Sequence, residues 1–185
     1  TGVDGLTRGE LPTKGTDEIR ARECEAASAV LGLKYRENLG LPDGFVDPAS
    51  REQLNKVVEV LRRRQPELVL VPWIEDRHPD HSAAGELITR AIFFSGLLRF
   101  ETVPPSERFV VRQVLYYQLR HRFAPSFVTD TSPAFERKKQ AIACYASQVS
   151  RAPNEAPTLI SSPRALEAIE ARDRFFGSMI GTSHG

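Results

Sequence analysis

Residues 68–81 read Leu-Val-Leu-Val-Pro-Trp-Ile-Glu-Asp-Arg-His-Pro-Asp-His, and this stretch decides the fold. Its first four residues are a continuous apolar run, which is typical of a parallel strand that is covered on both faces. A helical pattern precedes the run at residues 51–64, and another follows it at residues 83–94 and ends near Gly96. A strand, a loop and a helix in this order indicate an α/β fold.

The rest of the chain continues this alternation. We predict a helix from Thr16 to about residue 30, which Gly32 ends, and Ser50 with Gln53 forms a capping box for the helix at residues 51–64. A strand is predicted at residues 110–117, helices after Ser132-Pro133 and Ser162-Pro163, and a loop at residues 149–161. The alternation predicts a three-layer, Rossmann-like α/β fold with a mostly parallel central sheet, in a single domain over residues 1–185.

The composition excludes several classes of function. Lysine and arginine together number 25 against 24 acidic residues, so the net charge of +1 gives no field that attracts nucleic acid or an anionic membrane. The two cysteines, Cys24 and Cys144, have no paired spacing, which favours free thiols in a reducing cytoplasm over a disulfide framework. Since no apolar stretch reaches the roughly 18–20 residues of a membrane span, we expect a cytoplasmic protein.

Two histidines directly follow the predicted strand, in Glu75-Asp-Arg-His-Pro-Asp-His81. Ligands of open α/β sheets bind beyond the carboxyl ends of the strands, so this heptapeptide lies where an active site is expected. One of the two imidazoles could bind a metal while the other faces a substrate at the same centre. A catalytic zinc usually has three protein ligands. The residues alone therefore leave open a plain polar turn, in which Asp80 caps the next helix.

The heptapeptide resembles the second metal motif of the LmbE/PIG-L de-N-acetylases. Three further blocks follow the order of that family, namely Leu6-Thr-Arg-Gly-Glu10, Gly15-Thr-Asp-Glu-Ile-Arg20 and Asn38-Leu-Gly-Leu-Pro-Asp43. Later segments resemble its bacillithiol-biosynthesis branch, namely Phe123-Ala-Pro-Ser-Phe127, Tyr145-Ala-Ser-Gln148 and Ala171-Arg-Asp-Arg-Phe-Phe-Gly177. The resemblance thus extends over essentially the whole chain.

This resemblance implies roles for individual residues. His81 matches a zinc ligand of the family, and His78 matches the histidine that acts as an acid or stabilises the oxyanion, with Asp80 orienting it. Arg20 matches an arginine that contacts the substrate, which suits the bidentate fork of a guanidinium. The alternative for Arg20 is a solvated charge on the first helix.

Two acidic residues are further candidates for substrate binding. Asp43 and Glu10 lie in loops that we expect at the same face as the histidines, where they could accept hydrogen bonds from sugar hydroxyls. Either residue could equally form a turn or cap a helix.

One motif of the family is missing from the sequence. The family's first motif, Ala-His-Pro-Asp-Asp in its usual form, supplies two zinc ligands and the carboxylate base, whereas the first histidine of this chain is His78. We therefore expect the first strand and helix to be missing and the sequence to be truncated at both ends. We also expect these 185 residues alone to bind zinc weakly and to show no turnover. An active-site tyrosine of some relatives has no counterpart in residues 157–169.

The resemblance implies a Zn²⁺-dependent hydrolase that removes the acetyl group from an N-acetylglucosamine conjugate, with N-acetylglucosaminyl malate as the expected substrate. The alternatives are another N-acetylglucosamine conjugate, a chitooligosaccharide, or a non-catalytic binding domain if the gene also lacks the first motif. The resemblance further implies a homo-oligomer, as large as a hexamer, and no nucleic-acid or membrane partner. Phe93, Phe94, Leu97 and Leu98 could form the contact between subunits or belong to the core.

Overall fold

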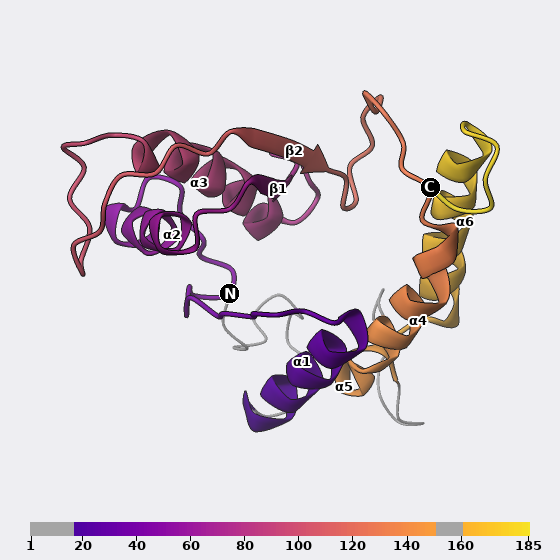
Figure 1. Cartoon of the computed structure of the whole chain (residues 1–185). Coiled ribbons are helices and arrows are strands. Elements are labelled where there is room, and N and C mark those ends of the chain that lie inside the picture. Colours follow the sequence, from indigo (N-terminus) through magenta and orange to yellow (C-terminus); the bar gives the residue numbers. More distant parts are fainter. Residues whose placement is uncertain (1–16, 151–160) are drawn as a thin grey trace. The chain divides into compact units, whose positions relative to one another are not determined.

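The computed structural model describes residues 17–150 and 161–185, and these residues belong to two compact units (Figure 1). The first unit contains residues 38–123, and the second contains the remaining described residues. A single domain over residues 1–185 stays a prediction. In the described ranges, no helix has both the length and the apolar character needed to cross a membrane.

The first unit is a β–α–β arrangement with one additional helix. It consists of α2 (Arg51–Arg64), β1 (Leu68–Pro72), α3 (Pro79–Ser95) and β2 (Gln113–Tyr117). β1 and β2 pair in parallel, with Leu68 opposite Gln113 at one end and Pro72 opposite Tyr117 at the other. Parallel neighbours need a crossover connection, which α3 provides. The predicted α/β class with a parallel sheet is confirmed.

The start of α2 confirms half of the predicted capping box. Ser50 is the N-cap, and its side chain accepts a hydrogen bond of 3.3 Å from the backbone N–H of Gln53. The Gln53 side chain does not reach back to Ser50, because its Oε1 accepts from the backbone N–H of Asp47 at 2.9 Å and its amide donates to the carbonyl of Phe45. Gln53 therefore fixes the loop before α2 as well as its first turn.

The core of the first unit lies between α2, α3 and one face of β1. The buried members of this cluster are Leu41, Val46, Leu54, Val57, Val58, Leu61, Leu87 and Ala91. Val69 and Val71 share one face of β1, and Val69 packs against this cluster while Val71 is fully buried. Leu68 and Leu70, on the opposite face, are 41% and 59% exposed. Within the first unit, α2 and α3 cover one face of β1, and coverage of the other face stays a prediction.

The long segment between α3 and β2 is held by one buried cation. Arg62 of α2 is only 4% exposed, and its guanidinium donates to five backbone carbonyls. These carbonyls belong to Phe94, Ser95, Leu97, Phe100 and Ser106. Burial lowers the pKa of Arg62, but full hydrogen bonding compensates a buried charge. The hydrogen bonds from Arg62 thus hold this segment in place, as the backbone hydrogen bonds of a helix or a strand would.

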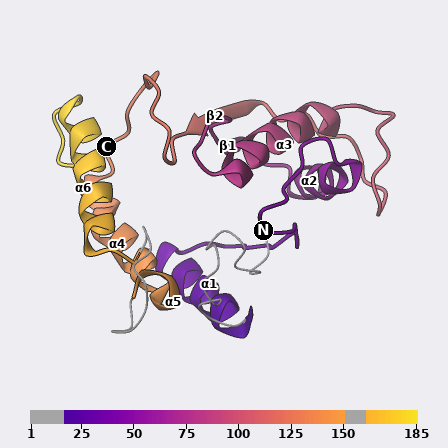
Figure 2. The ribbon, with the colours of Figure 1, turned by 180° about the vertical axis from the view of Figure 1, so that it is seen from behind.

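The second unit is helical and contains η2 (Ser132–Ala134), a 3₁₀ turn that leads directly into α4. Its helices are α1 (Asp17–Leu31), α4 (Phe135–Ala143), α5 (Ala146–Val149) and α6 (Pro163–Ser178). α1 packs against α4 and α5, which Figure 2 shows from behind. Gly32 ends α1 with a φ of +69°, and Ser162 caps α6, as predicted. The four-residue α5 was not predicted.

Buried polar contacts hold the second unit together. Glu23 of α1 accepts hydrogen bonds from the N–H and hydroxyl of Ser147 at 2.6 and 2.8 Å, which fixes the first turn of α5. Asp173 of α6 pairs with Lys138 of α4. The His184 ring stacks on Phe135 with centroids 3.7 Å apart. These contacts join segments that are far apart in the sequence.

Candidate active site

The predicted histidine motif follows the carboxyl end of β1, beside the carboxyl end of β2. The backbone N–H of Trp73 donates to the carbonyl of Tyr117 at 3.0 Å, so the two chains stay paired one residue beyond the strands. Both connections then leave the sheet at the same edge. This edge is where open parallel sheets bind ligands.

His78 is the N-cap of α3, with Pro79 in the first turn of the helix. Its Nδ1 accepts a hydrogen bond of 3.2 Å from the backbone N–H of Asp80. His81 lies one turn into the helix, and the two imidazoles stack with centroids 4.7 Å apart. Asp80 does not cap the helix, because His78 occupies the N-cap position. The alternative that the motif is a plain polar turn stays open.

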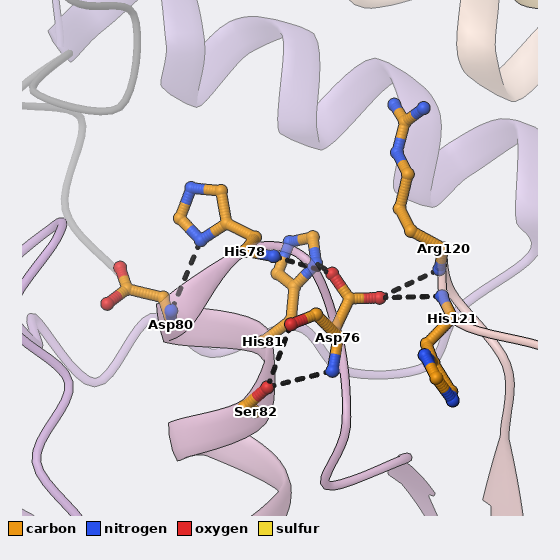
Figure 3. A network of polar contacts seen from close by, with 7 residues as sticks. All are labelled: Asp76, His78, Asp80, His81, Ser82, Arg120 and His121. Carbon is orange, nitrogen blue, oxygen red and sulfur yellow. Dashed lines mark hydrogen bonds and ion pairs between the residues drawn. The ribbon is translucent and has the colours of Figure 1, made fainter.

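The buried carboxylate of Asp76 organises the site (Figure 3). The sequence analysis did not single out this residue. One oxygen accepts from the His81 ring Nδ1 and from the backbone N–H of His78, both at 2.9 Å. The other oxygen accepts from the backbone N–H groups of Arg120 at 2.8 Å and His121 at 3.3 Å. The side chain is 1% exposed. Its position five residues before His81 was a usable signal, because metal-binding histidines commonly donate their second nitrogen to a carboxylate.

The charge of Asp76 is stabilised within the site. Burial by itself raises the pKa of Asp76, but hydrogen bonds from the backbone of His78, Arg120 and His121 and from the His81 ring outweigh burial and lower the pKa to about 2. Asp76 is therefore ionised at neutral pH and accepts the proton on His81 Nδ1 as a hydrogen bond.

The Nδ1 atoms of the two histidines have opposite hydrogen-bonding roles. His81 donates from Nδ1 to Asp76, so in the neutral ring its Nε2 carries a free lone pair, as a metal ligand requires. His78 accepts at Nδ1 from the backbone, so the proton of its neutral ring lies on Nε2. The pair thus combines one nitrogen suited to bind a metal with one N–H suited to donate to an oxyanion or an amine.

Asp80 binds a neighbouring loop through its carboxylate. Its carboxylate accepts from the backbone N–H groups of Gly44 at 2.6 Å and Val46 at 3.2 Å, and the residue is 5% exposed. Asp80 contacts the His78 ring through its own backbone N–H and not through its carboxylate. The carboxylate instead fastens the loop that carries Asp43 to the first turn of α3. Asp43 therefore belongs to the same unit as the histidines.

Of the other two predicted substrate residues, the structure describes one. Arg20 is in α1 of the second unit, where it lines a cavity of about 470 Å³ between α1, α4 and α5. The cavity walls are otherwise mainly apolar, and the buried Nε of Arg20 has no hydrogen-bond partner there. Glu10 lies outside the described residues. The roles of Arg20 and Glu10 stay predictions.

The motif fits one ligand position of a metal site. The His81 lone pair, backed by the ionised Asp76, is the histidine–carboxylate pair found at protein-bound metals. In the ranges that the structure describes, no three His, Cys, Asp or Glu side chains come together as a ligand group. Because a catalytic zinc usually takes three protein ligands, the described residues account for only part of such a site.

His121 is part of this region, although its sequence position is isolated. Its Nε2 lies 3.2 Å from a carboxylate oxygen of Glu75, and its backbone N–H donates to Asp76. The turn after β2 is therefore attached to the motif at two adjacent residues. Sequence spacing could not reveal this contact, because it joins positions 45 residues apart.

Comparison with known proteins gives relatives in one family. A family model described as "PIG-L: GlcNAc-PI de-N-acetylase" matches residues 1–92. The chain is 29% identical to the diacetylchitobiose deacetylase of Thermococcus kodakarensis over 80% of its length. It is 27% identical to the 4-oxalmesaconate hydratase of Pseudomonas putida over 76% of its length. These matches cover 56% and 55% of the two relatives, so the chain spans about half the length of the curated relatives it matches.

A solved structure extends the match to the fold. The conserved protein TT1542 from Thermus thermophilus is 36% identical, with a TM-score of 0.82, over 95% of this chain and 74% of that one. The predicted family is confirmed by these similarities together with the ordered sequence blocks. The chain therefore belongs to the PIG-L/LmbE family of GlcNAc-PI de-N-acetylase-like proteins.

Proposed function

We propose that the protein is a zinc-dependent amide hydrolase that removes the acetyl group from an N-acetylglucosamine conjugate, with N-acetylglucosaminyl malate as its substrate. The hydrogen bond between His81 and Asp76 is the observation that carries the proposal, because it leaves the His81 Nε2 free to bind a metal. Support also comes from the family description and from the deacetylase among the relatives.

The residues of this chain take distinct parts in the proposed reaction. His81 holds the metal and Asp76 fixes the tautomer and orientation of its ring. Bound zinc would polarise the acetamide carbonyl and acidify a water molecule. The His78 Nε2–H would donate a hydrogen bond to the developing oxyanion. The proton of the water would pass to a carboxylate base, which the resemblance assigns to the family's first motif, and from that base to the departing amine.

The hydratase relative supports a second candidate. A hydratase adds water to a carbon–carbon double bond, and the same pairing of a metal ligand with an N–H donor can position and activate water for that reaction. Deacetylation is favoured because both the family description and the more similar curated relative name it.

Acetate release by the full-length gene product tests the proposal. N-acetylglucosaminyl malate, N,N′-diacetylchitobiose and 4-oxalmesaconate are supplied to zinc-loaded protein. We expect acetate from the malyl glycoside, loss of zinc and activity in His81→Ala, and about a 100-fold lower kcat with zinc retained in His78→Ala. Acetate from chitobiose alone would remove the proposed substrate. Turnover of 4-oxalmesaconate without any acetate release would replace the deacetylase by the hydratase.

A further inference from the structure

The turn after β2 brings a cationic sequence to the edge of the histidine site. Arg120, His121 and Arg122 are all exposed. Asp76 Oδ2 accepts from the N–H groups of the first two, while Oδ1 of the same carboxylate binds His81. One buried side chain therefore sets the distance of the turn from the candidate metal ligand.

The Arg120 side chain extends from the turn beside this site, and the fold does not use it. In Figure 3 it extends to the side on which the His78 ring lies, whereas the His121 ring turns to the opposite side. The His121 Nε2 is already in contact with a carboxylate oxygen of Glu75. Arg120 takes part in the described contacts only through its backbone N–H, so its guanidinium has no hydrogen-bond or ion-pair partner in the described ranges. Asp76 offers the guanidinium no further acceptor, because its two oxygens already accept four hydrogen bonds.

A guanidinium in this position has a definite chemical preference. Its planar fork of N–H donors matches the two oxygens of a carboxylate, which it binds more selectively than a point charge would. Its backbone is fixed by Asp76, so less conformational freedom is lost when a ligand binds. A sugar hydroxyl offers such a group one neutral acceptor, whereas a carboxylate attached to the sugar matches two of its donors and its charge.

We propose that Arg120 determines specificity by binding a carboxylate on the group attached to the amino sugar. The inference rests on the proposed function, since it assumes that the sugar conjugate lies over His78 and His81. It assigns the selection of anionic substrates to the turn after β2, and thereby to a part of the chain separate from the histidines.

Binding measurements can test this role independently of catalysis. N-acetylglucosaminyl malate and its neutral dimethyl ester are titrated calorimetrically into the zinc-loaded full-length protein. Arg120→Ala is compared with Arg120→Lys and with Arg122→Ala, which removes the same charge two residues away. We expect Arg120→Ala to weaken binding of the dicarboxylate about tenfold and to leave the diester unchanged. Arg120→Lys should recover part of the loss, and Arg122→Ala should stay within twofold of the wild type.

Each contrary result has a single meaning. Equal losses for the acid and the ester, equal losses in the two alanine variants, or a wild type that prefers neither ligand overturns the role of Arg120. Acetate release, measured on the same samples, reports on the proposed function separately. A wild type that discriminates between the ligands through Arg120 but releases no acetate would retain the inference and lose the deacetylase.

Discussion

Replacement of Asp76 by asparagine should weaken both the fold and the metal site. The amide keeps one acceptor oxygen and turns an NH₂ group toward two N–H donors, so two of the four hydrogen bonds in this network are lost. Charge-assisted bonds contribute about 1.5–3 kcal/mol each, and relief of the buried charge offsets part of that loss. We expect Asp76→Asn to lower the free energy of unfolding by about 3 kcal/mol, which urea denaturation measures.

The same substitution should lower the affinity for zinc. The His81 ring loses the carboxylate that fixes its tautomer, and such outer partners typically contribute 10–100-fold to metal affinity. Zinc titration of the full-length protein, monitored by calorimetry at a temperature at which the variant remains folded, measures the effect.

Asp80→Asn is the matched control. Asp80 is also a buried aspartate in the motif, and it also binds two backbone N–H groups, but its carboxylate accepts from the loop at residues 44–46 and not from His81. We expect it to lose stability while its zinc affinity stays within about threefold of the wild type. Unchanged zinc affinity in Asp76→Asn, or an equal loss in Asp80→Asn, would refute the assignment of Asp76 as the partner of His81.

Three further substitutions test the fold and the assembly. Arg62→Met should cost about 4 kcal/mol because it strands buried carbonyls. Arg63→Met breaks an ion pair with Glu59 one turn away on the same helix and should cost about 0.5 kcal/mol; comparable urea midpoints would contradict the role of Arg62. Gly85→Ala would place a Cβ 2.6 Å from the carbonyl oxygen of Pro72, so we expect a loss of about 1–3 kcal/mol by overpacking, and an unchanged melting temperature would refute it. We propose a homo-oligomer in which Phe93, which is 66% exposed, contacts a neighbouring subunit. Phe93→Ser should then lower the mass measured by light scattering, and an unchanged mass would exclude this contact.

Local sequence signals predicted the elements whose ends are set by their own residues. Ser50, Ser162 and Gly32 act at helix ends through hydrogen bonds or backbone angles within a few positions, so the pattern alone located them. The apolar run at residues 68–71 located β1 for the same reason. Which helices cover its two faces could not be predicted in the same way, because coverage depends on the elements that pack there and not on the strand.

The candidate site was predicted only as far as its motif extends. His78 and His81 were found because three positions separate them on a loop after a strand. Asp76 was missed because its importance comes from contacts with the turn at residues 120–121, which lies more than 40 positions away. The contact of Asp80 with His78 is made by its backbone N–H, whereas its side chain turns to the loop before α2, which the sequence did not indicate.

The attachment of the turn after β2 to Asp76 has a consequence for how the family can diversify. The carboxylate holds main-chain N–H groups, which every residue type except proline possesses. The Arg120 side chain can therefore be exchanged without moving the turn or disturbing His81, whereas exchange of His121 also removes the contact of its ring with Glu75. A proline at either position is the exception, because it would remove a donor and leave part of a buried charge unpaired. The position of the turn, and with it the geometry of His81, thus depends on main-chain atoms and not on the side chain at position 120.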